Sequence, residues 1–188
     1  MRSFAVASVL TFTGGLTLFG GMFLLPLYYQ QVRHESVVAA GLLLVPLGVG
    51  ALPARSTGPL ADRVGPRPVV VTGLLLTALG TLPFCTGTHD DVLLCLALVV
   101  RGLGMSAANL ALLVGAFQDL APEHVADASG TTRVLQQLGG SFGTAVLAAV
   151  LAGDGFPSAF LWSTAFTVVA ALVGLCLPIR VASAEARP

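Results

Sequence analysis

Charge is the scarcest property of this sequence. Charged side chains make up 10% of its 188 residues, whereas a soluble domain carries about 25%. Lysine is absent, and nine arginines are balanced by nine acidic residues. Because no positive excess is available to meet phosphates, the composition excludes a nucleic-acid-binding chain. With 55% hydrophobic residues, too little polar side chain remains to cover a soluble globule, which favours lipid as the surrounding solvent.

Groups for enzymatic chemistry are also few. The three cysteines are widely spaced and lie in or beside apolar runs, so they form neither a disulfide framework nor a zinc-ligand pattern. The three histidines fall in polar connections, and no Ser/His/Asp, Cys/His or paired-carboxylate arrangement is present. The sequence therefore does not predict an enzyme, and neither a cofactor nor a metal is expected.

Six continuous apolar runs have the length that crosses a bilayer as a helix. Because the runs do not alternate with a period of two, they are expected to be helices rather than barrel strands. We predict an all-α, polytopic membrane protein with one six-helix bundle over residues 1–180 and a cytoplasmic tail at 181–188. The third run is the shortest, and Pro83 is expected to end or kink its helix. The predicted spans cover approximately residues 5–29, 37–54, 69–86, 92–116, 131–152 and 159–178.

The arginines are distributed unevenly between the two ends of the predicted spans. Only Arg33 is assigned to one side, and Arg101 lies inside the fourth run. Because basic residues accumulate on the cytoplasmic side of a membrane, we expect both termini to be cytoplasmic and the protein to lie in the inner or plasma membrane. The first run is longer than the core of a signal peptide, which has about 7–15 residues, so cleavage is not expected. The arginines assigned to the cytoplasmic side are Arg2, Arg55, Arg63, Arg67, Arg133, Arg180 and Arg187.

The turn between the second and third runs reads G-x-x-x-D-R-x-G-x-R. The glycines permit a tight turn, the aspartate can cap a neighbouring helix N-terminus, and the arginines would hold the turn at the membrane interface. A generic arginine-rich cytoplasmic loop would also account for these charges. The motif residues are Gly58, Asp62, Arg63, Gly65 and Arg67.

This turn resembles the cytoplasmic gating motif of the major facilitator superfamily, in the copy that joins the second and third helices of the carboxyl-terminal half. FLLPLYYQQV and AAGLLLVPLGVGALPA look like the first two helices of that half in 14-span drug:proton antiporters of the EmrB/QacA type. VVRGLGMSAANLAL and DASGTTRVLQQLGGSFGTAVL are similar to the tenth helix, in twelve-helix counting, and to the next helix. The resemblance extends from about Phe4 to Pro178. The turn departs from the family pattern at Pro66 and Pro68, which flank Arg67 where the family often has adjacent basic residues.

The resemblance implies an exporter of drug-like small molecules that works by proton-coupled alternating access. In the family, the turn motif of one bundle contacts the other bundle, and each carrier contains two six-helix bundles. This chain has room for one, so a second is implied, from the same longer polypeptide, a second chain or a second copy. The alternative is a truncated or accessory membrane subunit with no transport activity of its own. No Asp or Glu lies within a predicted span, so a titrating carboxylate would come from the other bundle.

Polar side chains within the predicted spans are candidates for a transport path. Arg101, Met105, Asn109 and Leu112 follow one another at spacings of three and four, which places them on one stripe of a helix. An arginine at this depth costs at least about 2.5–3.5 kcal/mol, so Arg101 should face protein or a water-filled cavity. It either lines the path or bonds to a neighbouring helix. Gln136 and Gln137 in the fifth span are path candidates or interhelical hydrogen-bonding groups.

Small residues recur at four-residue spacing within the spans, as in Gly139–Gly143 and Gly102–Ser106. Because lipid offers no hydrophobic force to hold helices together, such positions let two backbones approach closely. Close packing accounts for them, and helices that bend or slide during a transport cycle would use the same residues.

Overall fold

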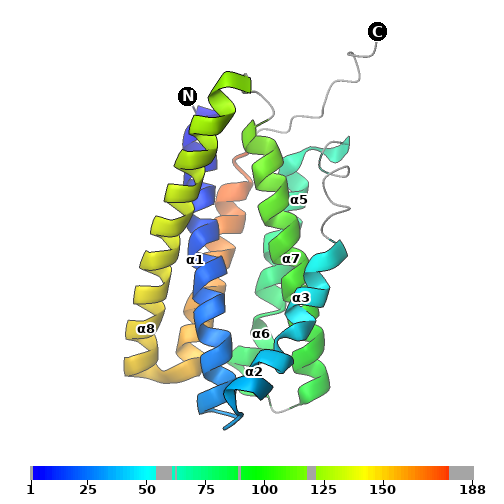
Figure 1. Cartoon of the computed structure of the whole chain (residues 1–188), viewed down its shortest axis with the longest axis vertical. Helices are drawn as coiled ribbons and strands as arrows, with labels where there is room; N and C mark the ends of the chain where they lie inside the picture. The colour runs from blue at the N-terminus through cyan, green and yellow to red at the C-terminus, as the bar shows by residue number, and fades with distance from the viewer. Residues whose placement is uncertain (1, 54–60, 62, 89, 118–121, 178–188) are drawn as a thin grey trace.

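The computed structural model describes residues 2–53, 61, 63–88, 90–117 and 122–177. Over these residues every regular element is a helix, as predicted, and the long helices run up and down in one elongated bundle (Figure 1). The helices are α1 (Arg2–Gln31), α2 (Val37–Leu43), α3 (Val45–Ala51), α5 (Pro66–Leu79), α6 (Leu82–Cys85), α7 (Asp91–Phe117) and α8 (Pro122–Gly174).

Several helical stretches are long and apolar enough to cross a membrane, which makes the chain a multi-pass membrane protein. In the described part of the chain there are four: Ser8–Gln31, Pro66–Cys85, Asp91–Val114 and Ser129–Gly174. The stretch Val37–Ala51 is also apolar but shorter. The last stretch contains 46 residues and would be about 69 Å long as a straight helix. That is more than twice the hydrocarbon thickness of a bilayer, about 30 Å.

The excess length of α8 is explained by a reversal at Gly155. This residue has φ 78° and ψ −176°, a backbone conformation that is essentially confined to glycine. Figure 1 shows two antiparallel arms on either side of the reversal, the first arm (122–154) and the second arm (156–174). The first arm begins at Pro122, nine residues before the predicted span, because proline is favourable at the first position of a helix.

Two other helices are interrupted close to a proline. The second predicted span is divided at Leu44, just before Pro46, into α2 and α3. The third is divided at Gly80 and Thr81 into α5 and α6, with Pro83 in the first turn of α6. The expected kink of the third helix is therefore confirmed. Pro83 has no N–H to donate to the carbonyl of Leu79, the last residue of α5, and its ring would clash with that carbonyl in a continuous helix.

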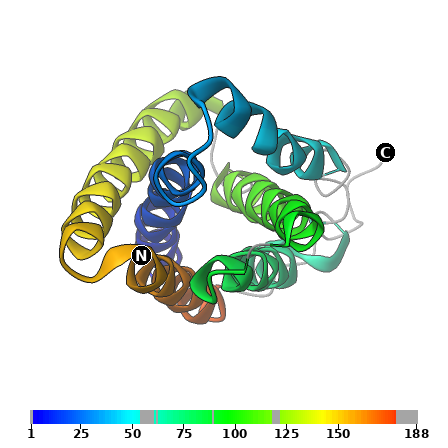
Figure 2. The same ribbon diagram turned by 90° about the horizontal axis from the view of Figure 1, so that it is seen from below.

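The helices alternate in direction, so α1, α5 and the first arm of α8 begin at the same end of the bundle (Figure 1). We call this the proximal end; α7 and the second arm of α8 finish there, and the turn at Gly155 lies at the opposite, distal end. Seen along the bundle axis, the arms of α8, α5 and the α2–α3 pair are arranged around α1 and α7 (Figure 2). The most extensive contacts join α1 to α8 and α5 to α7.

Glycines bring α1 and the first arm of α8 into backbone contact. A Cβ atom at Gly15 would overlap the carbonyl of Gln136, and one at Gly139 would overlap the carbonyl of Phe12. One at Gly143 would lie 2.8 Å from the Cα of Leu16. The close approach predicted for Gly139 and Gly143 is therefore confirmed.

The packed interior differs from one end to the other. At the distal end Tyr28 is surrounded by four aromatic rings, with ring centroids 5.5–5.8 Å away. Towards the proximal end the buried residues are mostly small, such as Ala107, Ala111 and Ala170. The buried polar side chains of the described helices are Thr13, Thr17, Thr77, Thr81, Arg101, Ser163 and Thr167.

We predict that replacing Gly139 by Ala destabilises the bundle, because the added methyl group would push α1 away from α8. Overpacking of this kind typically costs about 1–3 kcal/mol. Gly130→Ala on the same helix is the control, since a Cβ there meets no atom within 4 Å and alanine favours a helix over glycine by up to about 1 kcal/mol. The measurement is thermal unfolding of the purified protein in detergent. Equal unfolding midpoints for the two variants would contradict the backbone contact.

Candidate functional site

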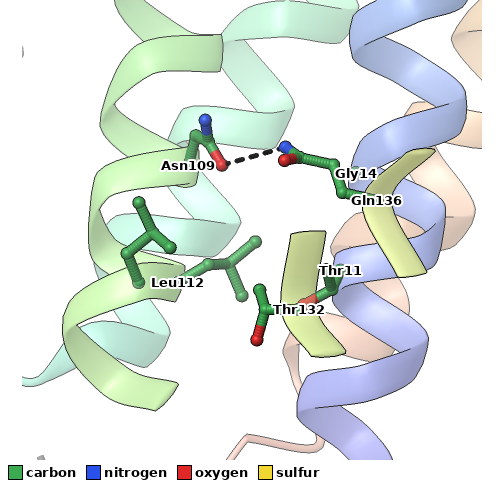
Figure 3. A pocket seen from close by; sticks show the side chains of 7 residues that line it. Thr11, Gly14, Asn109, Leu112, Thr132 and Gln136 are labelled. Carbon is green, nitrogen blue, oxygen red and sulfur yellow. Dashed lines mark hydrogen bonds between the residues drawn. The ribbon is translucent and has the colours of Figure 1, made fainter. Parts of the chain in front are cut away.

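A small pocket of about 60 Å³ lies between α1, α7 and the first arm of α8 (Figure 3). Its residues come from the first half of α1, the end of α7 and the beginning of α8, so it lies towards the proximal end. This volume is smaller than that of a typical small-molecule site, about 300–1,000 Å³. The lining consists of two amides, two hydroxyls, two leucines and a glycine: Thr11, Gly14, Asn109, Leu112, Leu113, Thr132 and Gln136.

The two amides meet across the pocket. Gln136 Nε2 on α8 donates a hydrogen bond to Asn109 Oδ1 on α7, at a distance of 3.5 Å (Figure 3). This distance is at the long limit for an N–H···O bond, so the contact is weak. Both side chains are half-buried.

The pocket depends on two adjacent glycines of α1. Gly15 lets the α1 backbone lie against the carbonyl of Gln136, whereas a Cβ at Gly14 would meet no atom within 4 Å. One glycine therefore fixes the distance between α1 and α8, and its neighbour faces the open space that the pocket occupies.

The other path candidates lie elsewhere. Gln137 is exposed and lines a second, outward-facing groove, with Phe19, Gly140, Ser141 and others. Met105 is half-buried and is not among the lining residues of either site. The structure thus brings Asn109 and Gln136 together and leaves Gln137 and Met105 outside the pocket.

Arg101 lies in the interior of the bundle rather than in the pocket. Its side chain is 4% exposed, and Nη1 donates a hydrogen bond to Thr81 Oγ1. The Thr81 hydroxyl in turn donates to the carbonyl oxygen of Thr77 at 2.7 Å. A Cβ at Gly21 on α1 would overlap Arg101 Nη2, so the guanidinium lies directly against the backbone of α1. The packing of Arg101 matches the interhelical-bonding alternative raised from the sequence.

The broken helix α5 helps to compensate the charge of Arg101. Thr81 follows Gly80, the C-cap of α5, and the C-terminal end of a helix carries a partial negative charge of about half an electron. A guanidinium beside this end is favourably placed, although the described part of the chain offers it no carboxylate partner. The break between α5 and α6 therefore provides both the helix end and the Thr81 hydroxyl that the buried arginine contacts.

The structure describes only part of the turn motif. Gly58 and Asp62 lie outside the described residues. Arg63 is exposed, Arg67 is partly exposed, and Gly65 is buried at the N-cap of α5 with φ 87° and ψ 156°. Because this positive φ strains any residue with a side chain, the structure explains why glycine stands at position 65.

Leu112, on the predicted stripe, lines the pocket. Two further lining residues could have been found from helical spacing. Thr132 lies four residues before Gln136, and Leu113 lies four residues after Asn109, so each shares a helix face with a predicted candidate. Thr11 and Gly14 carry no such signal, because nothing in the sequence tells which face of α1 meets α7 and α8. No group of three His, Cys, Asp or Glu side chains capable of holding a metal ion occurs among the described residues.

The family model of the Major Facilitator Superfamily matches residues 56–188, more than half of the chain. The chain belongs to the Major Facilitator Superfamily. This membership agrees with the all-helical, multi-pass fold and with the resemblance of the turn motif.

Several relatives in this superfamily carry names that refer to drug resistance or export. The "Multidrug resistance protein B homolog" of Mycobacterium tuberculosis is 39% identical over 155 residues, which cover 80% of this chain and 29% of the relative. "Lincomycin resistance protein LmrB" of Listeria monocytogenes is 31% identical over 79% of this chain and 32% of its own length. The "Tetracenomycin C resistance and export protein" of Streptomyces glaucescens is 31% identical over 81% and 30%. The chain therefore matches less than a third of the length of each relative.

We predict an energetic coupling between Arg101 and Thr81. Thr81→Val removes the hydroxyl acceptor and leaves a buried donor unpaired, which costs about 1–3 kcal/mol. In an Arg101→Met background the same replacement should cost much less, because the charge is no longer present. Unfolding midpoints of the wild type, both single variants and the double variant in detergent measure this coupling. Additive effects would show that the guanidinium does not depend on Thr81.

Proposed function

We propose that this chain is the carboxyl-terminal six-helix bundle of a small-molecule efflux permease. The observation that carries the proposal is a pocket of amide and hydroxyl groups between α1, α7 and α8 in a chain of the Major Facilitator Superfamily. The names of the relatives, which refer to multidrug, lincomycin and tetracenomycin C resistance, favour export of drug-like molecules.

Six spans follow if three features are combined. The two arms of α8 count as two spans, because each arm is a long helix and the two run in opposite directions (Figure 1). The apolar α2–α3 stretch counts as another, in spite of its break at Leu44. Together with α1, α5–α6 and α7 they make six, which is the number of helices in one bundle of a facilitator carrier.

The proximal end of the bundle is proposed to face the cytoplasm. Arg63 and Arg67 lie beside the start of α5 at that end, and Arg133 lies near the start of the first arm of α8. At the distal end the described chain carries Arg33, which forms a salt bridge with Asp91 at 2.5 Å. Because positive residues accumulate on the cytoplasmic side, this distribution supports cytoplasmic termini in the inner or plasma membrane.

A second bundle is proposed to pack against the outer face of α1 and the first arm of α8. Gln137, Ser141 and Thr144 lie on this face, in a groove that the rest of the described chain leaves uncovered. Polar and small side chains of this kind are typical of helix–helix contacts in lipid. The occupant we favour is the other half of the same carrier, because the relatives are more than three times as long as the matched region.

Alternating access would then arise from rocking of the two bundles around the pocket. The acidic residues of the described chain lie outside its long apolar stretches, at their ends or, in the case of Asp154, beside the reversal at Gly155, so proton coupling would require a carboxylate from the second bundle. Asp62, Arg63 and Arg67 would stabilise one orientation of the bundles, and no catalytic step is proposed.

We predict that the complete carrier lowers the accumulation of lincomycin or tetracenomycin C in cells that lack their own exporters. Asp62→Asn should reduce this export about tenfold or more, because a charge-assisted hydrogen bond of about 1.5–3 kcal/mol would be lost from one orientation of the bundles. Asp154→Asn, at an exposed position near the distal turn, is the matched control. Accumulation is measured with labelled drug, and the amount of protein in the membrane is measured in parallel.

Two results would contradict the proposal. Undiminished export by the Asp62→Asn carrier would remove the gating role of the turn. If a complete, membrane-inserted carrier exports neither drug, the accessory-subunit alternative is favoured instead. The same holds if the chain and its native partner together show no transport activity.

A further inference from the structure

Helix α7 packs against α5 and α3 through direct backbone contacts. A Cβ atom at Gly73 of α5 would overlap the carbonyl oxygen of Gly104 on α7, and one at Gly104 would overlap the carbonyl oxygen of Gly73. On the other side of α7, a Cβ at Gly102 would overlap the carbonyl of Leu47 on α3. Because backbones in such close contact cannot shift past one another without steric overlap, we treat α3, α5 and α7 as one unit, the α7 block.

A second unit consists of α1 and the first arm of α8. These two helices share the most extensive contact of the bundle together with α5 and α7, and Gly15 and Gly139 each lie against a carbonyl of the partner helix. We call this unit the α1 block. The bundle thus contains two groups of helices, each joined internally by contacts between backbones.

The boundary between the two blocks is loosely packed on the side of the pocket. Helices α1 and α7 touch over a short stretch, and over the described residues α7 and α8 share no extensive backbone contact. The pocket of about 60 Å³ lies on this boundary, with Thr11 and Gln136 on one side and Asn109 and Leu112 on the other. The atoms that line a void lack neighbours there, so they gain little attraction across it. We call this boundary the seam.

Two contacts hold the blocks together away from the pocket. At the distal end Tyr28 of α1 packs against Phe84 of α6 with ring centroids 5.5 Å apart, and the same core contains the fully buried Leu98 of α7. The second arm of α8 lies beside both α1 and α5 (Figure 2), since a Cβ at Gly174 would meet side chains of both helices within 4 Å. The seam is therefore free to open only at the proximal end, on the side of the pocket.

We propose that the bundle opens along this seam at its proximal end, that the distal core acts as the hinge, and that the hydrogen bond between Gln136 and Asn109 is the latch. This bond joins the two blocks across the pocket at 3.5 Å, a distance at which it breaks at little cost. Opening would enlarge the pocket from the proximal end. The inference concerns movement within one bundle, so it goes beyond the rocking of two bundles and does not depend on the proposed function.

Distances between paired spin labels test the proposal in the complete carrier, in detergent and in a cysteine-free background. Cysteines at Val114 of α7 and Val134 of α8 span the proximal seam, whereas cysteines at Val9 of α1 and Val134 lie within the α1 block. Cysteines at Met22 of α1 and Leu96 of α7 span the boundary nearer the distal end. Double electron–electron resonance should give two distances for the first pair, the longer one being the minor, and one distance for each of the other two pairs.

Variants of the amide pair test the latch. Gln136→Leu and Asn109→Leu should each raise the ratio of the longer to the shorter distance about fivefold, because the closed arrangement loses one weak hydrogen bond. Gln31→Leu removes an exposed amide at the end of α1 remote from the pocket, and it should leave the ratio unchanged. Asn109→Lys combined with Gln136→Glu replaces the amide contact by an ion pair and should lower the ratio below that of the wild type.

The outcomes separate this inference from the proposed function. A single distance for the first pair in both the wild type and Gln136→Leu would overturn the seam, and so would two distances for the pair within the α1 block. An unchanged ratio in Gln136→Leu would overturn the latch. Rocking of the whole bundle alters none of the three distances, because all the labels belong to one bundle. A carrier that exports drugs can therefore fail this test, and one that exports neither lincomycin nor tetracenomycin C can pass it.

Discussion

The close approach of α1 to the first arm of α8 is the constraint on which the rest of the bundle depends. In lipid there is no hydrophobic force between helices, so contact requires either small residues or polar bonds. Gly15 and Gly139 supply the small residues from opposite sides, and each lies against a backbone carbonyl of the partner helix. This contact holds Gln136 close to α1, and Gln136 in turn meets Asn109 of α7 across the pocket.

Away from that contact, the bundle is held by a different kind of interaction. Arg101 lies against Gly21 of α1 and bonds to Thr81 at the break between α5 and α6, so one side chain joins three helices. The distal aromatic cluster around Tyr28 adds a dense apolar contact between α1, α6 and the second arm of α8. The proximal half has smaller core residues, and the pocket lies in this half.

Helix-forming segments could be predicted from the sequence, because long apolar runs need backbone hydrogen bonds satisfied within each segment. The prediction of the path was less complete for a geometric reason. Each residue turns a helix by about 100°, so four-residue steps drift by about 40°, and Arg101 and Asn109 point about 80° apart. Of the predicted stripe, Arg101 therefore faces the break between α5 and α6, whereas Asn109 lines the pocket. Gln136 and Gln137 are divided in the same way, one inside the pocket and the other on the outer face.

The partners of each helix could not be predicted, because they depend on contacts between distant segments. Nothing in the sequence near Thr11 indicates that it lines the same pocket as Asn109. Likewise, the sequence does not indicate that the helix break at Gly80 lies beside Arg101. The sharp reversal at Gly155 is a partial exception. The polar segment GDGFPS marks a connection, but the structure is needed to show that one residue with φ 78° reverses the chain.

The two polar contacts of α7 constrain the bundle to different degrees. Asn109 and Gln136 meet at 3.5 Å, at the long limit for an N–H···O bond, and both side chains are half-buried. Arg101 is buried and is bonded to Thr81. Because a buried charge that loses its partner costs much more than a half-buried amide that does, α7 is held more firmly against the break between α5 and α6 than against α8.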